Sequence, residues 1–180
     1  MYGPVIQGKV ARLRPLRVEE AEQMIAWFED VEVTRTILRR FPPSLTDERE
    51  WIEKLATSPN DIIWAIEYEG RLVGTTGVHG IDWPNQHGTT GTLIGDRSAW
   101  GKGLGTEVMQ LRARFVFTET TLQKLNSGYL DGNTASARAQ ARCGYVEIGR
   151  MRKEYFRDGK WIDQIMTELL REDWEKANSV

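Results

Sequence analysis

Three glycines at alternate positions lie within the stretch IGDRSAWGKGLGTEVM, which covers residues 94–109. They are Gly101, Gly103 and Gly105. An apolar, strand-like run precedes them and a helix-like run follows. A strand that leads through such a turn into a helix N-terminus forms an anion site, because the first amides of the helix are unpaired and its dipole adds partial positive charge. Lys102 adds a cation and Thr106 a hydroxyl donor. The stretch therefore predicts a phosphate-binding turn.

Three kinds of phosphate loop are compared with this stretch. A Walker A loop needs Gly-Lys followed by Ser or Thr. Here Gly103 follows Lys102, so the pattern fails. The dinucleotide pattern Gly-x-Gly-x-x-Gly would need glycine at Thr106, and no regular βαβ array surrounds it. The acyl-CoA pyrophosphate loop, Arg/Gln-x-x-Gly-x-Gly/Ala, matches WGKGLG except at Trp100. This third pattern fits best.

The hydrophobic pattern predicts the elements that must position this turn. Pro42-Pro43 is expected to end the second helix, and Glu69-Gly70 to form a turn between two strands. Thr46 or Asp47 is expected to cap the third helix, which stops near Pro59. The expected elements of this half are a strand at 9–14, helices within 18–30 and 31–44, a helix carrying Trp51, Ile52 and Leu55, and two strands within 61–81.

The second half continues this alternation of strands and helices. Asn133 is expected to cap a helix that Gly144 closes, and Asp158-Gly159 to turn a hairpin. Residues 175–180 are expected to fray. The expected elements are strands at 89–96, 124–130, 145–156 and 160–170, and helices at 105–118 and 133–144, after a loop at 83–88. The order predicts an α+β fold, a mixed sheet with helices on both faces.

Length and composition limit the classes of function. The 180 residues suit one domain, 1–180, and the net charge of −2 gives no basic field for nucleic acid. The single cysteine, Cys143, excludes an intrachain disulfide and a multi-cysteine zinc site, so we expect no metal. No apolar run has the length of a signal peptide or a membrane span. We therefore expect a cytoplasmic protein with no membrane partner.

Four further matches accompany the glycine turn in order: LIGD before it, then Asn133, CGY, and GKWIDQIMTELL near the end. Together they resemble the GNAT (GCN5-related) N-acetyltransferase superfamily over almost the whole chain. The sequence is most similar to the branch that contains bacterial acetyltransferases of ribosomal-protein N-termini, in which an aromatic-Gly-x-Gly turn is common. The resemblance implies a mostly antiparallel sheet, acetyl-CoA as donor and a primary amine as acceptor, which attacks the thioester directly in a ternary complex.

The resemblance also implies which residues hold the donor. Backbone amides of the turn would bind the pyrophosphate, and a strand splayed from its neighbour would pair with the pantetheine amides. An amide of that strand would also polarise the thioester oxygen. The implied residues are Leu93, Ile94, Gly95, Trp100, Gly101, Lys102, Gly103, Leu104, Gly105, Thr106, Asn133 and Ser136.

The matching Asn of the family hydrogen-bonds the CoA arm, so Asn133 is expected to do this, to cap its helix, or both. Many members place an acid tyrosine seven residues later, where this chain has Gln140. Ser136 lies on the same helical face and is the nearest substitute as a proton donor for the thiolate. Water or an unassisted thiolate remains an alternative, as does a merely solvated Ser136.

The base that deprotonates the amine is less well defined. Many members place a Glu near the position of Thr89, which this chain lacks. His79 has a suitable unperturbed pKa of about 6.5, with Asp82 and His87 nearby in the sequence. Asp163 matches an Asp of the last hairpin and would hold the amine or pair within the sheet. Desolvation of the amine with water as proton acceptor is an alternative.

The resemblance places the acceptor between the first two helices and the last hairpin. Arginines 35, 39 and 40 there would meet an acceptor carboxylate or form plain charged surface, and the aromatic side chains would frame the acceptor or belong to the core. The acceptor is expected to be a small-molecule amine or a protein N-terminus. The resemblance also makes a homodimer an expectation. Because the usual Glu and Tyr are missing, a catalytically weak or inactive acyl-CoA-binding sensor is the alternative function.

Overall fold

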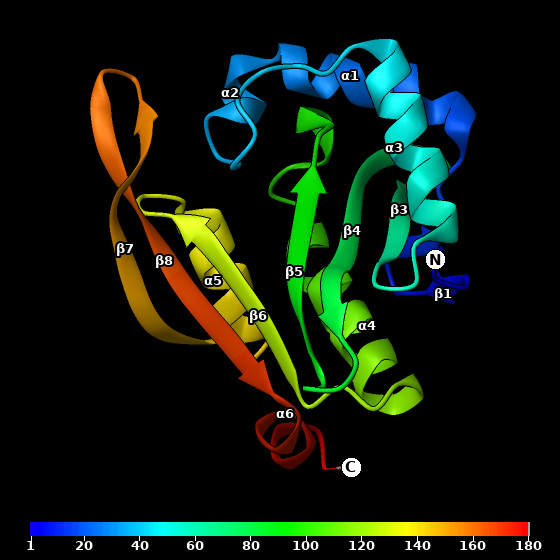
Figure 1. Ribbon diagram of the computed structural model, residues 1–180, viewed down its shortest axis with the longest axis vertical. Helices are drawn as coiled ribbons and strands as arrows, with labels where there is room; N and C mark the ends of the chain where they lie inside the picture. The colour runs from blue at the N-terminus through cyan, green and yellow to red at the C-terminus, as the bar shows by residue number, and fades with distance from the viewer. Residues whose placement is uncertain (180) are drawn as a thin grey trace.

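The computed structural model describes residues 1–179, which form an eight-stranded sheet in the order β1-β2-β3-β4-β5-β6-β8-β7 (Figure 1). Neighbouring strands are antiparallel, except that β5 and β6 are parallel. The mostly antiparallel mixed sheet matches the fold class expected from the sequence. The strands are β1 (Ile6–Gln7), β2 (Ala11–Arg14), β3 (Ile62–Tyr68), β4 (Arg71–Asp82), β5 (His87–Ile94), β6 (Lys124–Leu130), β7 (Val146–Arg157) and β8 (Lys160–Leu170).

Helices cover both faces of the sheet. Met24 of the first helix and Ile52 of the third pack on Ala65 of β3 in one apolar cluster. Val108 of the fourth helix packs with Trp64 of β3 in the other cluster, on the opposite face. The helices are α1 (Ala21–Glu29), α2 (Val31–Thr34), α3 (Leu45–Thr57), α4 (Leu104–Glu119), α5 (Thr134–Arg142) and α6 (Arg171–Asn178), with short 3-10 turns at Val18–Glu20 and Arg97–Ala99.

The sheet opens between its two parallel strands. β5 pairs with β6 only through Gly88 and the residues on either side of it, and the pairing ends at Thr89↔Asn126. Figure 1 shows the two strands diverging from that point. Residues 90–94 have no backbone partner on β6, and the Ser127 hydroxyl of β6 donates to the Thr90 carbonyl at 3.4 Å. At the far end, the Trp100 indole donates a hydrogen bond to the Ile94 carbonyl at 2.8 Å. One edge of β5 is thus free beside the glycine turn.

Three local expectations differ from the structure. Ser44 caps α3, because its extended backbone lets its hydroxyl accept from the Asp47 amide at 3.1 Å. Thr46 and Asp47 both lie inside that helix. Within 31–44 only Val31–Thr34 is helical, and the chain after it runs as an irregular loop held by residues distant in sequence.

The C-terminal segment is also more ordered than expected. Residues 175–178 belong to α6, whose Trp174 is buried against Phe117 with ring centroids 5.6 Å apart. This contact holds α6 against α4. Val180 lies outside the described residues. Among residues 1–179, no helix is long and apolar enough to cross a membrane.

Candidate active site

The glycine turn has the backbone geometry that an anion site requires. Gly101 and Gly103 adopt positive φ angles of 73° and 81°, which side chains of L-residues rarely tolerate. Gly103 is the N-cap of α4. An added Cβ at either glycine, or at Gly105, would meet no protein atom within 4 Å. The first-turn amides of α4 therefore face open space, and these glycines leave room for a phosphate to approach them.

An acidic residue in the first turn of α4 accepts hydrogen bonds from the backbone. The Glu107 carboxylate accepts hydrogen bonds from the amides of Lys9 and Ala11, at 2.5 and 2.8 Å, and from Val10. These contacts fix the turn before β2 against the start of α4. Because three donors face this carboxylate, its charge opposes an anion at the glycine turn less than a free carboxylate would.

A cleft of about 740 Å³ begins at this turn and runs through the opening between β5 and β6 to the underside of α1 and α3. One side carries the glycine turn, the end of β5 and the start of α5. The other side carries residues of α1, α3 and the loop at 35–43. Predicted site residues on its wall are His79, Leu93, Ile94, Trp100, Gly101, Gly103, Leu104, Gly105, Thr106, Asn133 and Ser136.

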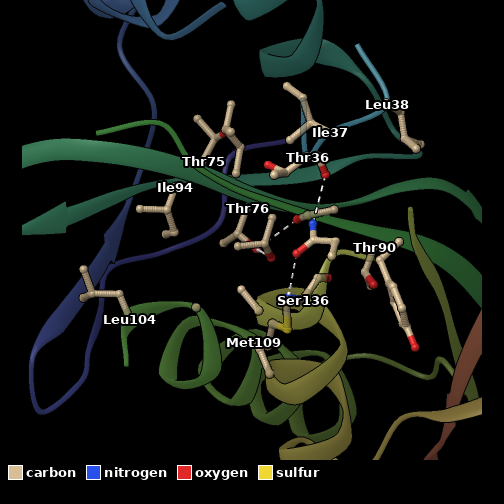
Figure 2. A pocket seen from close by; sticks show the side chains of 18 of the residues that line it. Thr36, Ile37, Leu38, Thr75, Thr76, Thr90, Ile94, Leu104, Met109 and Ser136 are labelled. Atoms are coloured by element: carbon tan, nitrogen blue, oxygen red, sulfur yellow. Dashed lines mark hydrogen bonds between the residues drawn. The ribbon is translucent and has the colours of Figure 1, made fainter. Parts of the chain in front are cut away.

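Asn133 joins the two sides of the cleft. Its side-chain oxygen accepts from the Ser136 amide at 3.0 Å, so it caps α5 as the sequence predicts. Its side-chain nitrogen donates to the Thr36 carbonyl in the loop after α2, also at 3.0 Å. The dashed bonds of Figure 2 link Thr36 and Ser136 through this side chain. The Asn133 side chain therefore lies on the cleft wall and connects the start of α5 with the loop after α2.

Ser136 is oriented by the glutamine that stands in place of a tyrosine. Gln140 is buried, and its side-chain oxygen accepts from Thr167 at 2.6 Å. Its nitrogen donates to Ser136 Oγ at 3.3 Å and to the Gly128 carbonyl at 3.4 Å. Because Ser136 Oγ accepts from Gln140, its own hydroxyl proton is free to point elsewhere. Ser136 lines the cleft and can direct that proton into it.

His79 lies inside β4, not after it, and is oriented by an aspartate. Its Nδ1 is 3.2 Å from Asp61 Oδ1, and that carboxylate also accepts from Ser58 and from the Gly80 amide. Burial lowers the pKa of His79 below its usual range, although Asp61 opposes this shift. The imidazole is therefore neutral near pH 7. A hydrogen bond from Nδ1–H to Asp61 leaves the lone pair of Nε2 free to accept a proton.

The Nε2 atom of His79 faces the floor of the cleft. An added Cβ would lie 3.1 Å from it at Gly77 and 4.0 Å at Gly91, two glycines paired across β4 and β5. His79 itself pairs with Thr89. Cross-strand partners project from the same face of a sheet. The imidazole therefore lies on the same face as the side chain of Thr89, the position near which many family members have a Glu. The arrangement is a neutral base above a floor of glycine backbone.

Comparisons with known proteins agree with this geometry. The sequence profile of the acetyltransferase (GNAT) domain matches residues 11–146. This chain belongs to the GNAT acetyltransferase family. It is 29% identical over 136 residues to the SPbeta prophage-derived N-acetyltransferase YokL of Bacillus subtilis strain 168, covering 75% of this chain and 76% of the relative. The acetyltransferase expected from the sequence is confirmed at the level of the family.

A second relative and one solved structure are also similar to this chain. YdaF of B. subtilis strain 168, whose name assigns it to ribosomal N-acetyltransferases, is 28% identical over 116 residues, or 64% of this chain and 63% of YdaF. The structure of RimL, a ribosomal L7/L12 α-N-protein acetyltransferase in complex with coenzyme A, aligns with a TM-score of 0.82. It shares 14% identity and covers 93% of this chain and 98% of RimL, so the likeness shows the fold.

Three predicted site residues of this acetyltransferase lie off the cleft wall. Gly95 packs on Trp27, whose indole would lie 2.1 Å from an added Cβ. Lys102 is exposed on the turn. Asp163 accepts from the Lys153 amide at 2.8 Å and from Arg150 at 3.2 Å within the last hairpin. These two donors lower the pKa of Asp163, so its position and its charge both make it a poor base.

Four residues at the cleft are not identified by the sequence pattern. Asp61 comes from the loop before β3, and Tyr129 projects from β6 into the cleft. Glu48 looks like an ordinary surface position of α3 in sequence, yet it is 1% exposed. Arg112 is equally buried, beneath β5, although arginine rarely is. The sequence does indicate that Arg112 is unusual, because this arginine lies on the apolar face of the α4 segment.

Proposed function

We propose that this acetyltransferase transfers an acetyl group from acetyl-CoA to a primary amine, by direct attack in a ternary complex. Gly103 and Gly105 would let the pyrophosphate reach the amides that begin α4. The free edge of β5 at residues 90–94 would pair with the pantetheine amides, as an added strand does. The open space above each glycine supports this fit, because no protein atom occupies it. Asn133 would supply a further donor to the arm.

The acceptor approaches from the α1–α3 side, where His79 lies. An alkylamine has a pKa of about 10.4 and is mostly protonated near pH 7, so it must lose a proton before it attacks. The amine nitrogen then forms a C–N bond with the thioester carbon, and the C–S bond breaks with its electron pair on sulfur. His79 Nε2 accepts the proton that the ammonium loses, and Asp61 stabilises the imidazolium that forms. The second proton of the attacking nitrogen passes to water as the C–S bond breaks.

Departure of the thiolate needs little general acid catalysis. A thiol pKa of about 8.5 makes a thiolate a fair leaving group. The Ser136 hydroxyl is free to donate a hydrogen bond toward it, because Gln140 already donates to Ser136 Oγ. In this proposal Gln140 is a positioning residue for Ser136. The proton that the thiolate finally takes comes from Ser136 or from water.

The observation that carries the proposal is the neutral His79 imidazole, held by Asp61 over Gly77 and Gly91 at the cleft floor. The test measures amine-dependent release of the CoA thiol, with mass spectrometry of the acetylated product. The panel contains aliphatic amines and peptides with free N-termini. The chain provides a matched control, because His87 is the other of its two histidines and is absent from the cleft wall.

We expect His79→Ala to lower kcat/KM by roughly a hundredfold to ten-thousandfold, the usual contribution of a general base. His87→Ala should stay within about twofold of the parent protein. Tight binding of acetyl-CoA without transfer to any amine of the panel would contradict the proposal. That result would favour a CoA-binding sensor.

A further inference from the structure

The cleft contains one buried carboxylate that lacks a hydrogen bond. Glu48 of α3 is 1% exposed and lies on the cleft wall, and its Oε2 accepts no hydrogen bond in residues 1–179. Glu48 is also the single carboxylate on that wall within the described chain. Buried polar atoms nearly always have partners, since an unpaired one costs free energy. An unpaired carboxylate facing a cleft therefore indicates a cationic partner from outside the chain.

The nearest cation only partly meets this need. Arg39 Nη1 is 3.6 Å from Glu48 Oε2, beyond hydrogen-bonding distance. The Arg39 side chain is 46% exposed and lies over the Phe28 ring, with 5.1 Å from guanidinium to centroid. Arg39 is therefore a half-exposed neighbour of Glu48 that makes no hydrogen bond to it. Burial raises the pKa of Glu48, and the charge of Arg39 only partly opposes that shift. A further cation beside Glu48 would therefore stabilise its ionised form.

The walls around Glu48 are apolar. Met24, Phe28 and Trp51 extend from α1 and α3, and Ile63 from β3 forms the floor that continues to Gly77. Such walls suit a methylene chain lying between the carboxylate and the histidine. The loop above is bonded on both sides, by Arg157 to the Leu38 carbonyl at 2.9 Å and by Asn133 to Thr36. A roof of this kind favours a slender ligand over the terminus of a folded protein.

We propose that Glu48 binds a second cationic group of the acceptor, so that the preferred acceptor is an aliphatic diamine. One amine lies at His79 and is acetylated. The other, as an ammonium ion, donates hydrogen bonds to Glu48 and displaces Arg39 from it. The apolar walls contact the methylenes between them. This inference rests on the proposed function, because it assigns the far end of the same acceptor.

The test compares pairs of acceptors that differ by one charge, 1,5-diaminopentane against pentylamine and the four-carbon equivalents, at saturating acetyl-CoA. In the parent protein we expect the diamine to have at least a tenfold higher kcat/KM. Glu48→Gln keeps the shape and removes the charge, and the ratio of diamine to monoamine should fall toward one. The control is Glu50→Gln, an exposed glutamate on the same helix paired only with Lys54, which should keep the parent ratio.

Several outcomes would overturn the inference while leaving the proposed function intact. They are equal use of diamine and monoamine by the parent protein, a ratio unchanged in Glu48→Gln, or a preference for peptide N-termini that ignores Glu48. If Glu48→Gln does not fold, Glu48→Met also removes the charge while filling a similar volume, and an unchanged ratio there would count against the inference. Absence of transfer to every amine would instead refute the proposed function itself.

Discussion

The guanidinium of Arg112 donates a hydrogen bond to the Gly91 carbonyl at 2.9 Å, from beneath the strand whose upper face carries the cleft floor. The same Nη1 lies 2.7 Å from Thr76 Oγ1 and 2.8 Å from Thr92 Oγ1. In residues 1–179 no carboxylate pairs with this buried cation, and its Nε has no partner. The peptide that joins Gly91 to Thr92 is therefore polarised by a positive charge. The N–H of this peptide points away from Arg112, and in the proposed mechanism it would donate a hydrogen bond to the thioester oxygen.

Removing this charge should change the titration of the base. The positive charge of Arg112 lowers the pKa of His79. Arg112→Met should therefore raise that pKa and move the acidic limb of the kcat/KM profile to higher pH. Arg114→Met, an exposed position on the same helix, is the control and should leave the limb in place. A limb that does not move in Arg112→Met, with the protein still folded by circular dichroism, would contradict this role.

Removing the aspartate beside the imidazole should shift the limb the other way. Asp61 raises the pKa of His79 through its charge and its hydrogen bond. In Asp61→Asn the limb should move to lower pH, and kcat/KM should fall by about tenfold to a hundredfold as the ring loses its orientation. Asp82→Asn removes a carboxylate near the other histidine and serves as the control. A shift to higher pH would show that another group controls the limb.

The glycine turn offers a test in which fold stability and CoA affinity change in opposite directions. Gly105 lies in the first turn of α4, and an added Cβ there meets no protein atom. Gly105→Ala should raise stability by up to about 1 kcal/mol, from helix propensity. It should lower CoA affinity at least tenfold, about 1.4 kcal/mol, by occupying the space of the pyrophosphate. Calorimetric titration checks this, with Gly149→Ala on β7 as the control. Unchanged affinity would remove the phosphate assignment.

The roles of two hydroxyl groups on the cleft wall can be distinguished by mutation. If Ser136 only assists departure, Ser136→Ala should cost about tenfold or less in kcat, with CoA affinity unchanged. Tyr129 lines the same cleft, and burial together with nearby carboxylates raises its pKa. Tyr129→Phe should therefore change kcat by less than Ser136→Ala. A thousandfold loss in either variant would identify that hydroxyl as the acid, and pre-steady-state rates of thiol release would distinguish it from slow product release.

The single cysteine should be nearly inert in the folded protein. Burial raises the pKa of Cys143 to about 11, so at pH 8 only about a thousandth of it is thiolate. A free cysteine, with a pKa of about 8.5, would be roughly two hundred times more ionised. Alkylation of the native protein by iodoacetamide should be slower by about that factor than in urea. Equal rates in both conditions would show that the site opens readily.

Local signals determine what the sequence predicts well here. The glycine turn, the Asn133 cap and the Asp158-Gly159 hairpin each depend on a few neighbouring residues, and the structure forms all three. The cap of α3 was misplaced because Ser44, Thr46 and Asp47 are all good capping residues. Only the path of the preceding loop decides among them.

The rest of the site depends on contacts distant in sequence. Asp61 meets His79 only because β3 and β4 pair, and nothing near Asp61 in the chain indicates this partner. Glu48 reads as a surface residue until α1 and the 35–43 loop cover it. The opening between β5 and β6 reflects where their pairing stops, which no local pattern encodes. Sequence therefore indicates the donor side of this site better than the acceptor side.

The hydrogen bond from Asn133 to Thr36 connects the donor side of the cleft to the loop on its acceptor side. A donor that takes the Asn133 amide as its partner competes with the Thr36 carbonyl, and so acts on the loop that roofs the acceptor. Coupling of this kind is reciprocal: whatever factor the donor imposes on acceptor affinity, the acceptor imposes on donor affinity. If the donor binds Asn133 as proposed, this hydrogen bond would couple the two affinities, and the affinity for each substrate would then have to be measured with and without the other.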